Sequence, residues 1–169
     1  AVKSSLYTET DVYRLAVNPQ GIDNVQKDPA PVGKGQPVPY YLETAEVHRN
    51  RQWTPVSPTS DPWTDDRIVA NGAPLTRSYT VSLDDLVAAG DGASVSVGVW
   101  AETDKNHVQV LLNGNQIADS SFGDLRDATV TTPVGTNLRA SGTNTITLRL
   151  PMDHGNRFEI DHVDRYSIT

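Results

Sequence analysis

The stretch His107-Val-Gln-Val-Leu-Leu-Asn-Gly-Asn-Gln-Ile117 has the pattern of a β-hairpin. Two runs of residues suited to strands flank the dipeptide Asn113-Gly114. Asn-Gly readily adopts the positive φ angles of a two-residue hairpin turn, so the stretch predicts two antiparallel strands joined at this point. Nothing in it is typical of catalysis. The stretch therefore indicates architecture and leaves function open.

Alternating patterns recur along the chain. Apolar and polar residues alternate with period two, which is typical of strands that have one face in a core and one in water. The alternating segments are 12–17, 78–83, 94–99 and 145–150. Only Leu83–Gly90 resembles a helical turn, with Gly90 as its end. The expected fold class is therefore all-β, an antiparallel β-sandwich that is jelly-roll-like.

The length of 169 residues fits one domain. Prolines and glycines are frequent between residues 19 and 39, which leaves little room for regular structure. We therefore expect a lead-in strand and a Pro/Gly-rich connection over residues 1–37, and the β-sandwich domain over 38–169. The chain begins at Ala1 rather than at a methionine, so we expect a processed or excised part of a longer protein.

Charge and cysteine content exclude several classes of function. Fourteen basic and twenty-one acidic side chains give a net charge of −7, which disfavours nucleic acid and anionic lipid as partners. No segment approaches the ~18 continuous apolar residues of a membrane span. The chain has no cysteine, so disulfides, thiolate nucleophiles and thiolate metal sites are excluded.

The order of motifs in the second half resembles a known group of domains. After the hairpin come Phe122-Gly123, Ala128–Pro133, Leu138–Ile146 and Phe158–Asp164. This order is similar to that of galactose-binding-like jelly-rolls and carbohydrate-binding modules.

The first half narrows the resemblance. The segments Asp11–Leu15, Tyr40–Glu43, Asp61–Trp63 and Tyr79–Leu83 follow one another. Their order resembles the β-sandwich that precedes the catalytic domain of gingipain-like cysteine peptidases, over most of residues 11–168. In that family the catalytic cysteine and histidine lie in a separate downstream domain. The resemblance therefore implies a domain that is not itself an enzyme.

Three functional hypotheses follow. The first is a non-catalytic accessory domain of a larger secreted peptidase-like protein, which packs on a catalytic domain or contacts an extracellular ligand. The alternative is a self-standing carbohydrate-binding module. The third, a hydrolase built from scattered Ser, His and Asp residues, is less favoured because the sequence has no Gly-x-Ser-x-Gly elbow. The first two imply a secreted or cell-surface location.

Tryptophans flank a proline-rich loop that extends from Thr54 to Asp66. The candidate ligand-binding residues are Trp53, Asp61 and Trp63, because a flat indole ring can stack on a sugar. The alternative is that both rings anchor a loop without regular hydrogen bonding. Trp100 has the opposite phase to the apolar residues of segment 94–99, so it is expected to pack under a loop or to lie in a shallow groove.

The resemblance also suggests a metal site. Some carbohydrate-binding modules hold a structural calcium ion with acids from the first and last strands, and the matching candidates here are Glu43, Glu46 and Asp161. Calcium requires six to eight oxygen ligands, so backbone carbonyls would have to contribute. Asp161 stands in an apolar stretch and needs a partner there. An arginine, backbone N–H groups and an ion are the alternatives.

The four histidines are scattered and show no helical zinc spacing. Asp153-His154 and Asp161-His162 recur eight residues apart. We interpret them as a polar loop and a solvent-facing strand position rather than as a pair of metal sites.

Overall fold

The computed structural model describes residues 42–84, 86–87, 92–123 and 125–169. Within these ranges nearly all regular structure is β-strand, joined by a single 3-10 turn, η1 (Thr136–Leu138). No helix in the described residues is long and apolar enough to cross a membrane. The predicted lead-in strand at 12–17 lies outside the described residues, and the predicted domain boundary near residue 38 stays a prediction.

The strands are β1 (Ala45–His48), β2 (Gln52–Trp53), β3 (Trp63–Thr64), β4 (Asp66–Asn71), β5 (Leu75–Leu83), β6 (Ser94–Ala101), β7 (Asn106–Leu112), β8 (Asn115–Phe122), β9 (Asp127–Pro133), β10 (Gly142–Leu150) and β11 (Phe158–Ile168).

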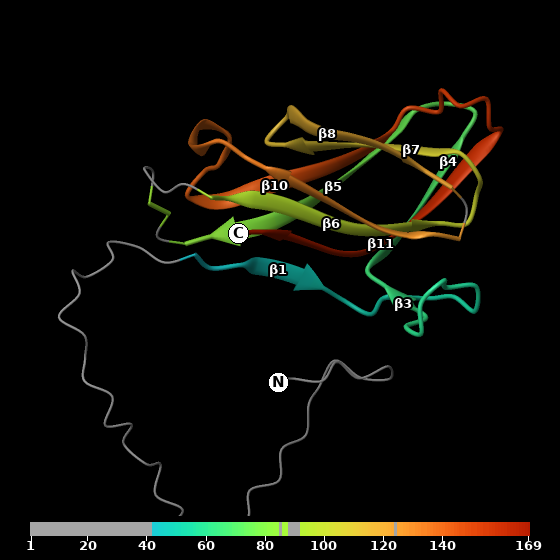
Figure 1. The fold of residues 1–169 in the computed structure, drawn as a ribbon, viewed down its shortest axis with the longest axis horizontal. Coiled ribbons are helices and arrows are strands. Elements are labelled where there is room, and N and C mark those ends of the chain that lie inside the picture. Colours follow the sequence, from blue (N-terminus) through green and yellow to red (C-terminus); the bar gives the residue numbers. More distant parts are fainter. Residues whose placement is uncertain (1–41, 85, 88–91, 124) are drawn as a thin grey trace, which may run out of the picture.

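Two antiparallel sheets face each other (Figure 1). The first has the order β1-β11-β6-β9, with β4 also paired to β11; the second has the order β5-β10-β7-β8. A separate two-stranded sheet consists of β2 and β3. The two large facing sheets confirm the prediction of an all-β antiparallel sandwich.

The opening hairpin forms as predicted. Strands β7 and β8 pair on either side of Asn113 and Gly114, whose φ angles are +49° and +85°. The Asn113 side chain also fastens the turn to β10, because its Oδ1 accepts the backbone N–H of Thr145 at 2.8 Å. Residues beyond the turn therefore contribute to its geometry.

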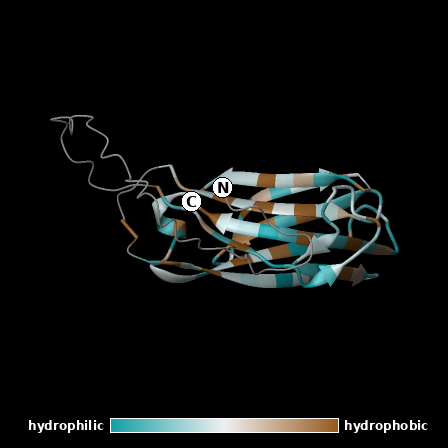
Figure 2. Cartoon of the chain, turned by 90° about the horizontal axis from the view of Figure 1, so that it is seen from below, coloured by the Kyte–Doolittle hydropathy of each residue, from teal (hydrophilic) through white to brown (hydrophobic). Residues whose placement is uncertain are grey.

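The core lies between the sheets. Side chains on alternate strand positions point inward, and Figure 2 shows the resulting alternation of hydrophobic and hydrophilic segments along the strands. The predicted strands at 78–83, 94–99 and 145–150 are all present. The most deeply buried core side chains include Ile68, Val95, Val97, Val99, Val108, Val110, Leu112, Ile146, Leu148, Leu150, Val163 and Ile168.

The predicted helical turn at Leu83–Gly90 is wrong in its described part. Leu83 is the last residue of β5 and pairs with Gly142 of β10, while Asp84, Leu86 and Val87 belong to no helix. Pairing along β5 continues the period-two pattern to Leu83, so tertiary pairing overrides the weak local signal for a turn of helix. The other residues of this segment lie outside the described residues.

Candidate functional site

A small hairpin on the outer face of the first sheet brings together the predicted ligand-binding residues. In this hairpin, which we call the tryptophan hairpin (residues 51–64), Trp53 of β2 pairs directly with Trp63 of β3. Its base is closed by two backbone hydrogen bonds of 2.9 Å, Arg51 N–H to Thr64 O and Thr54 N–H to Pro62 O. Figure 1 shows β3 and its loop on the β11 side of the sandwich, away from β7 and β8.

Side-chain hydroxyls and a carboxylate order the loop of the tryptophan hairpin. The hydroxyls of Ser57 and Thr59 donate to the carbonyl oxygen of Asp61 at 2.6 and 3.0 Å. The Asp61 carboxylate in turn accepts the backbone N–H of Trp63 at 3.0 Å. Asp61 therefore shapes the loop from both its backbone and its side chain, in the manner of an Asx turn.

The two tryptophans differ in burial. Trp53 is 59% exposed, whereas Trp63 is half-buried and its indole Nε1 is buried with no hydrogen-bond partner among the described residues. Directly opposed residues of an antiparallel pair place their side chains on the same face. The two roles considered for these rings, stacking on a sugar and anchoring the loop, therefore suit different residues. The exposed Trp53 has the geometry of a stacking platform, and the half-buried Trp63 has that of a loop anchor.

The predicted metal-binding acids are not brought together. Glu43 and Glu46 are exposed, and Glu46 of β1 lies opposite Ser167 of β11. Asp161 is 1% exposed and also lies on β11. At roughly 3.3 Å per strand residue, it is about 20 Å from Ser167. Strands β1 and β11 are neighbours, as the resemblance implies, but this register places Glu46 too far from Asp161 for one ion to contact both.

Asp161 instead forms a buried pair with Glu159, two residues earlier on the same inward face of β11. Glu159 is 0% exposed, and none of the four carboxylate oxygens of the pair has a hydrogen-bond partner among the described residues. Burial, and then the charge of Glu159, raise the pKa of Asp161 to about 8. Burial also raises the pKa of Glu159. Two unpaired carboxylates at this depth are costly when both are ionised.

The outer face of the first sheet holds a second polar group, which we call the Trp100 cluster (Thr64, Arg67, Trp100, Glu102 and His162). The rings of Trp100 and His162 stack with centroids 3.8 Å apart, so Trp100 is 2% exposed rather than lining an open groove. His162 contacts Glu102 through Nε2 at 2.6 Å and Thr64 through Nδ1 at 3.4 Å. Arg67 pairs with Glu102 at 3.3 Å.

This arrangement corrects the interpretation of His162 as solvent-facing. His162 is 0% exposed, and burial lowers its pKa although its hydrogen bond to Glu102 acts in the opposite direction. Burial also acts to raise the pKa of Glu102, but hydrogen bonds from Arg67 and His162 prevail and lower it. Thr64 is 1% exposed as well, so this hydroxyl–imidazole–carboxylate chain joins the tryptophan hairpin to the sheet.

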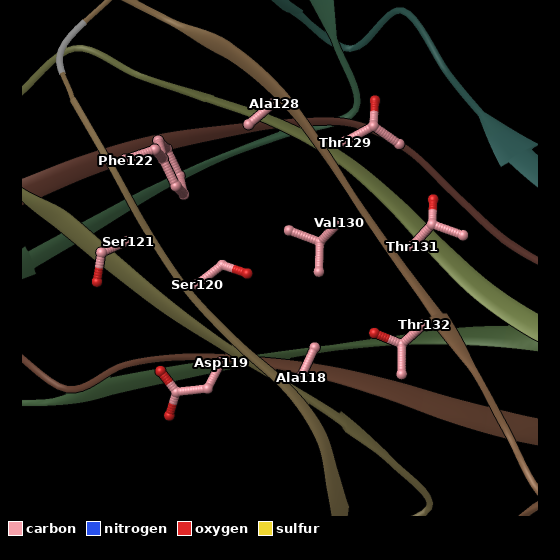
Figure 3. Close-up of a pocket in the computed structure, with 10 residues that line it drawn as sticks. All are labelled: Ala118, Asp119, Ser120, Ser121, Phe122, Ala128, Thr129, Val130, Thr131 and Thr132. Carbon is pink, nitrogen blue, oxygen red and sulfur yellow. The ribbon is translucent and has the colours of Figure 1, made fainter.

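A cavity of about 480 Å³ lies between the edge strands β8 and β9. Figure 3 shows residues of β8 on one side and residues of β9 on the other. Small hydroxyl and methyl side chains dominate its lining, and no sequence motif marks it. The lining residues are Ala118–Phe122 and Ala128–Thr132.

Comparisons with known proteins support the fold. No protein-family model and no curated protein matches the sequence. Dimeric latent PorU from Porphyromonas gingivalis has a similar structure, with 13% identity, a TM-score of 0.52, and coverage of 79% of this chain and 13% of that one. The chain thus corresponds to a small part of PorU. The resemblance to the β-sandwich of gingipain-like proteins is confirmed at the level of fold.

Two carbohydrate-binding modules are also similar. The CBM36-1 domain of a multidomain xylanase from the hindgut metagenome of Trinervitermes trinervoides has 18% identity and a TM-score of 0.49, covering 75% of this chain and 97% of that one. A CBM36 module in complex with calcium and xylotriose has 18% identity and a TM-score of 0.46, covering 76% and 100%.

Proposed function

We propose that this domain is a non-catalytic binding module that holds a neutral carbohydrate on the tryptophan hairpin. The observation that carries the proposal is the 59% exposure of Trp53 at a position held by direct pairing with Trp63. The apolar face of a sugar ring fits a flat, exposed indole ring. We also infer a secreted or cell-surface location, where such ligands occur.

The surroundings of Trp53 suit a hydroxyl-rich ligand. Arg51, which also pairs with Asp65 at 3.3 Å, and Gln52 precede Trp53 and are exposed, and Asp61 precedes Trp63 by two residues. Amide, guanidinium and carboxylate groups of this kind fix the orientation of a ligand whose ring stacks on the indole. Because hydrogen bonds from Ser57 and Thr59 already hold the loop, little conformational entropy is lost on binding.

The test is affinity electrophoresis through gels that contain single polysaccharides, followed by calorimetry with neutral oligosaccharides that include xylotriose. The wild-type domain should be retarded by at least one polysaccharide, and Trp53→Ala should weaken binding at least tenfold while leaving thermal unfolding unchanged. Phe158→Ala is the matched control, because Phe158 is also exposed, at 47%, but lies on β11 outside the hairpin. Equal binding by wild type and Trp53→Ala, or no retardation in any gel, would refute the proposal.

A second candidate is an accessory role inside a larger peptidase-like protein. The observation that favours it is the match to a region that makes up only 13% of PorU, since a domain of this fold is there a component of a long chain. In that case the catalytic domain of the parent polypeptide is the partner. Hydrogen exchange on the full-length protein would show one face of the sandwich protected relative to the isolated domain, and identical exchange in both would contradict it.

A further inference from the structure

Two histidines and an aspartate from distant parts of the chain meet at one end of the sandwich. We call them the His107 cluster: His107 at the start of β7, and Asp153 and His154 in the loop between β10 and β11. Each offers a ligand atom, and these atoms lie within 4.8 Å of one another. The imidazole rings of His107 and His154 have centroids 5.2 Å apart.

The contacts of His107 match those of a metal-binding imidazole. Its Nε2 lies 2.7 Å from Asp119 Oδ1, and its Nδ1 lies 2.8 and 2.9 Å from the two oxygens of Asp153. Metal-binding histidines commonly donate their second ring N–H to a carboxylate, which fixes the ring and its tautomer. Asp119 is placed for this supporting role on Nε2. The Nδ1 atom of His107 could then bind an ion together with Asp153.

The third group completes a three-ligand set. His154 Nε2 lies 4.0 Å from Asp153 Oδ1 and 3.1 Å from the hydroxyl oxygen of Ser121. Zinc bonds of about 2.0–2.2 Å in tetrahedral geometry place ligand atoms roughly 3.3 Å apart. Nδ1 of His107 and Asp153 would therefore separate by about half an ångström, and His154 would approach Asp153 by about 0.7 Å and His107 by up to about 1.5 Å. Asp153 and His154, which lie on the exposed loop, can make these shifts, while His107 is fixed on β7.

A buried carboxylate provides independent support for a cation here. Glu159 is 0% exposed and has no hydrogen-bond partner among the described residues. Burial raises its pKa, while the nearby charges of His154 and Asp153 act on it in opposite directions. An unpaired buried carboxylate is costly when ionised, so a positive charge bound by this loop would stabilise its ionised form.

We infer that His107, Asp153 and His154 bind a divalent transition-metal ion of the zinc class, with Asp119 supporting His107. Two imidazoles and a carboxylate favour zinc or a similar borderline metal over calcium, which prefers oxygen ligands alone. The ion links the 151–157 loop to β7 and β8. This site is distinct from the tryptophan hairpin and does not depend on carbohydrate binding.

The test is calorimetric titration of tag-free, EDTA-stripped protein with zinc chloride, with cobalt absorption as a spectroscopic readout. We expect one ion per chain, a rise in the midpoint of thermal unfolding, and a cobalt d–d band. His154→Ala should weaken binding at least tenfold; because His154 is exposed, this variant should still fold. Asp119→Asn should weaken binding roughly tenfold, as expected for a supporting carboxylate.

His48→Ala is the matched control, because His48 also pairs with an aspartate, Asp164 at 3.2 Å, but lies on β1. It should bind zinc like the wild type. The inference would be overturned by a lack of saturable zinc binding, by unchanged binding in His154→Ala, or by binding of calcium without zinc. A loss of binding in His48→Ala equal to that in His154→Ala would also overturn it, because the ion would then not be assigned to the His107 cluster.

Discussion

The imidazole of His162 lies flat on the indole of Trp100, with 3.8 Å between the ring centroids and 1° between the ring planes. The two residues are direct partners on β11 and β6, and they share the outer face of the sheet. This face would be solvated in a simple sandwich. The contact of Thr64 with His162 extends the buried interior beyond the space between the sheets.

Replacing Trp100 with alanine should therefore destabilise the fold as strongly as a core truncation. We expect a loss of about 3–5 kcal/mol in the free energy of unfolding, which is typical of removing a buried tryptophan. Urea unfolding followed by circular dichroism measures it. Trp53→Ala is the control and should change stability by less than about 0.5 kcal/mol, because Trp53 is mostly exposed. A similar loss in both variants would contradict the assignment of Trp100 to a buried cluster.

His162 should make stability sensitive to acid. Its folded-state pKa lies below the ordinary 6.5, so the unfolded chain takes up this proton at a higher pH than the folded chain does. The contribution of His162 is therefore fully present above about pH 6.5 and is lost as pH falls from there toward the folded-state pKa. Glu102, whose pKa is lowered, adds a loss of the same sign below about pH 4.5.

Urea unfolding of wild type and His162→Gln at pH 7.5, 6.0 and 5.0 checks this. The variant should lose less stability between pH 7.5 and 5.0 than the wild type, because glutamine does not titrate. His107 acts in the opposite sense, since its two carboxylate partners outweigh burial and raise its pKa, but it is common to both proteins. Parallel pH profiles for the two proteins would show that His162 does not control the acid sensitivity.

Replacing the titratable side chain of Asp161 with a neutral one should stabilise the domain. Its carboxyl group is buried near Glu159 and has no hydrogen-bond partner among the described residues. Because its pKa in the folded chain is about 8, the folded chain at pH 7 keeps a proton on Asp161 that the unfolded chain releases. We expect Asp161→Asn to raise the free energy of unfolding at pH 7 by on the order of 2 kcal/mol. Chemical denaturation in the presence of EDTA measures it. A loss of stability on this substitution would instead favour an ion or a hydrogen bond at Asp161.

The hairpin of β7 and β8 should require glycine at position 114 because of its backbone conformation and not because of limited space. Its φ of +85° disfavours any side chain, although a Cβ there would meet nothing within 4 Å. Gly114→Ala should cost about 1–2 kcal/mol. The control is Gly123→Ala, where an added Cβ would make only ordinary contact with Asp104, at 3.9 Å. Equal stability of the two variants would show that backbone strain at the turn is unimportant.

Local pattern predicted the strands at 78–83, 94–99 and 145–150, and the turn at Asn113-Gly114. Period-two alternation and positive-φ preference are properties of adjacent residues, so they can be read without the rest of the chain. The same reasoning failed at Leu83, where pairing with β10 decided the outcome. The sequence predicted a loop between Trp53 and Trp63, but neither the direct pairing of these residues nor the difference in their burial.

The sequence by itself determined an all-β sandwich and a candidate aromatic site on one loop. Only the tertiary structure decided that Glu46 and Asp161 lie apart, that Trp100 stacks on His162, and that His107 meets Asp153 and His154. Each of these depends on which strands become neighbours and in what register. Register is set by packing across the whole sandwich, including the shift in β11 between Val163 and Arg165, and no short stretch of sequence contains that information.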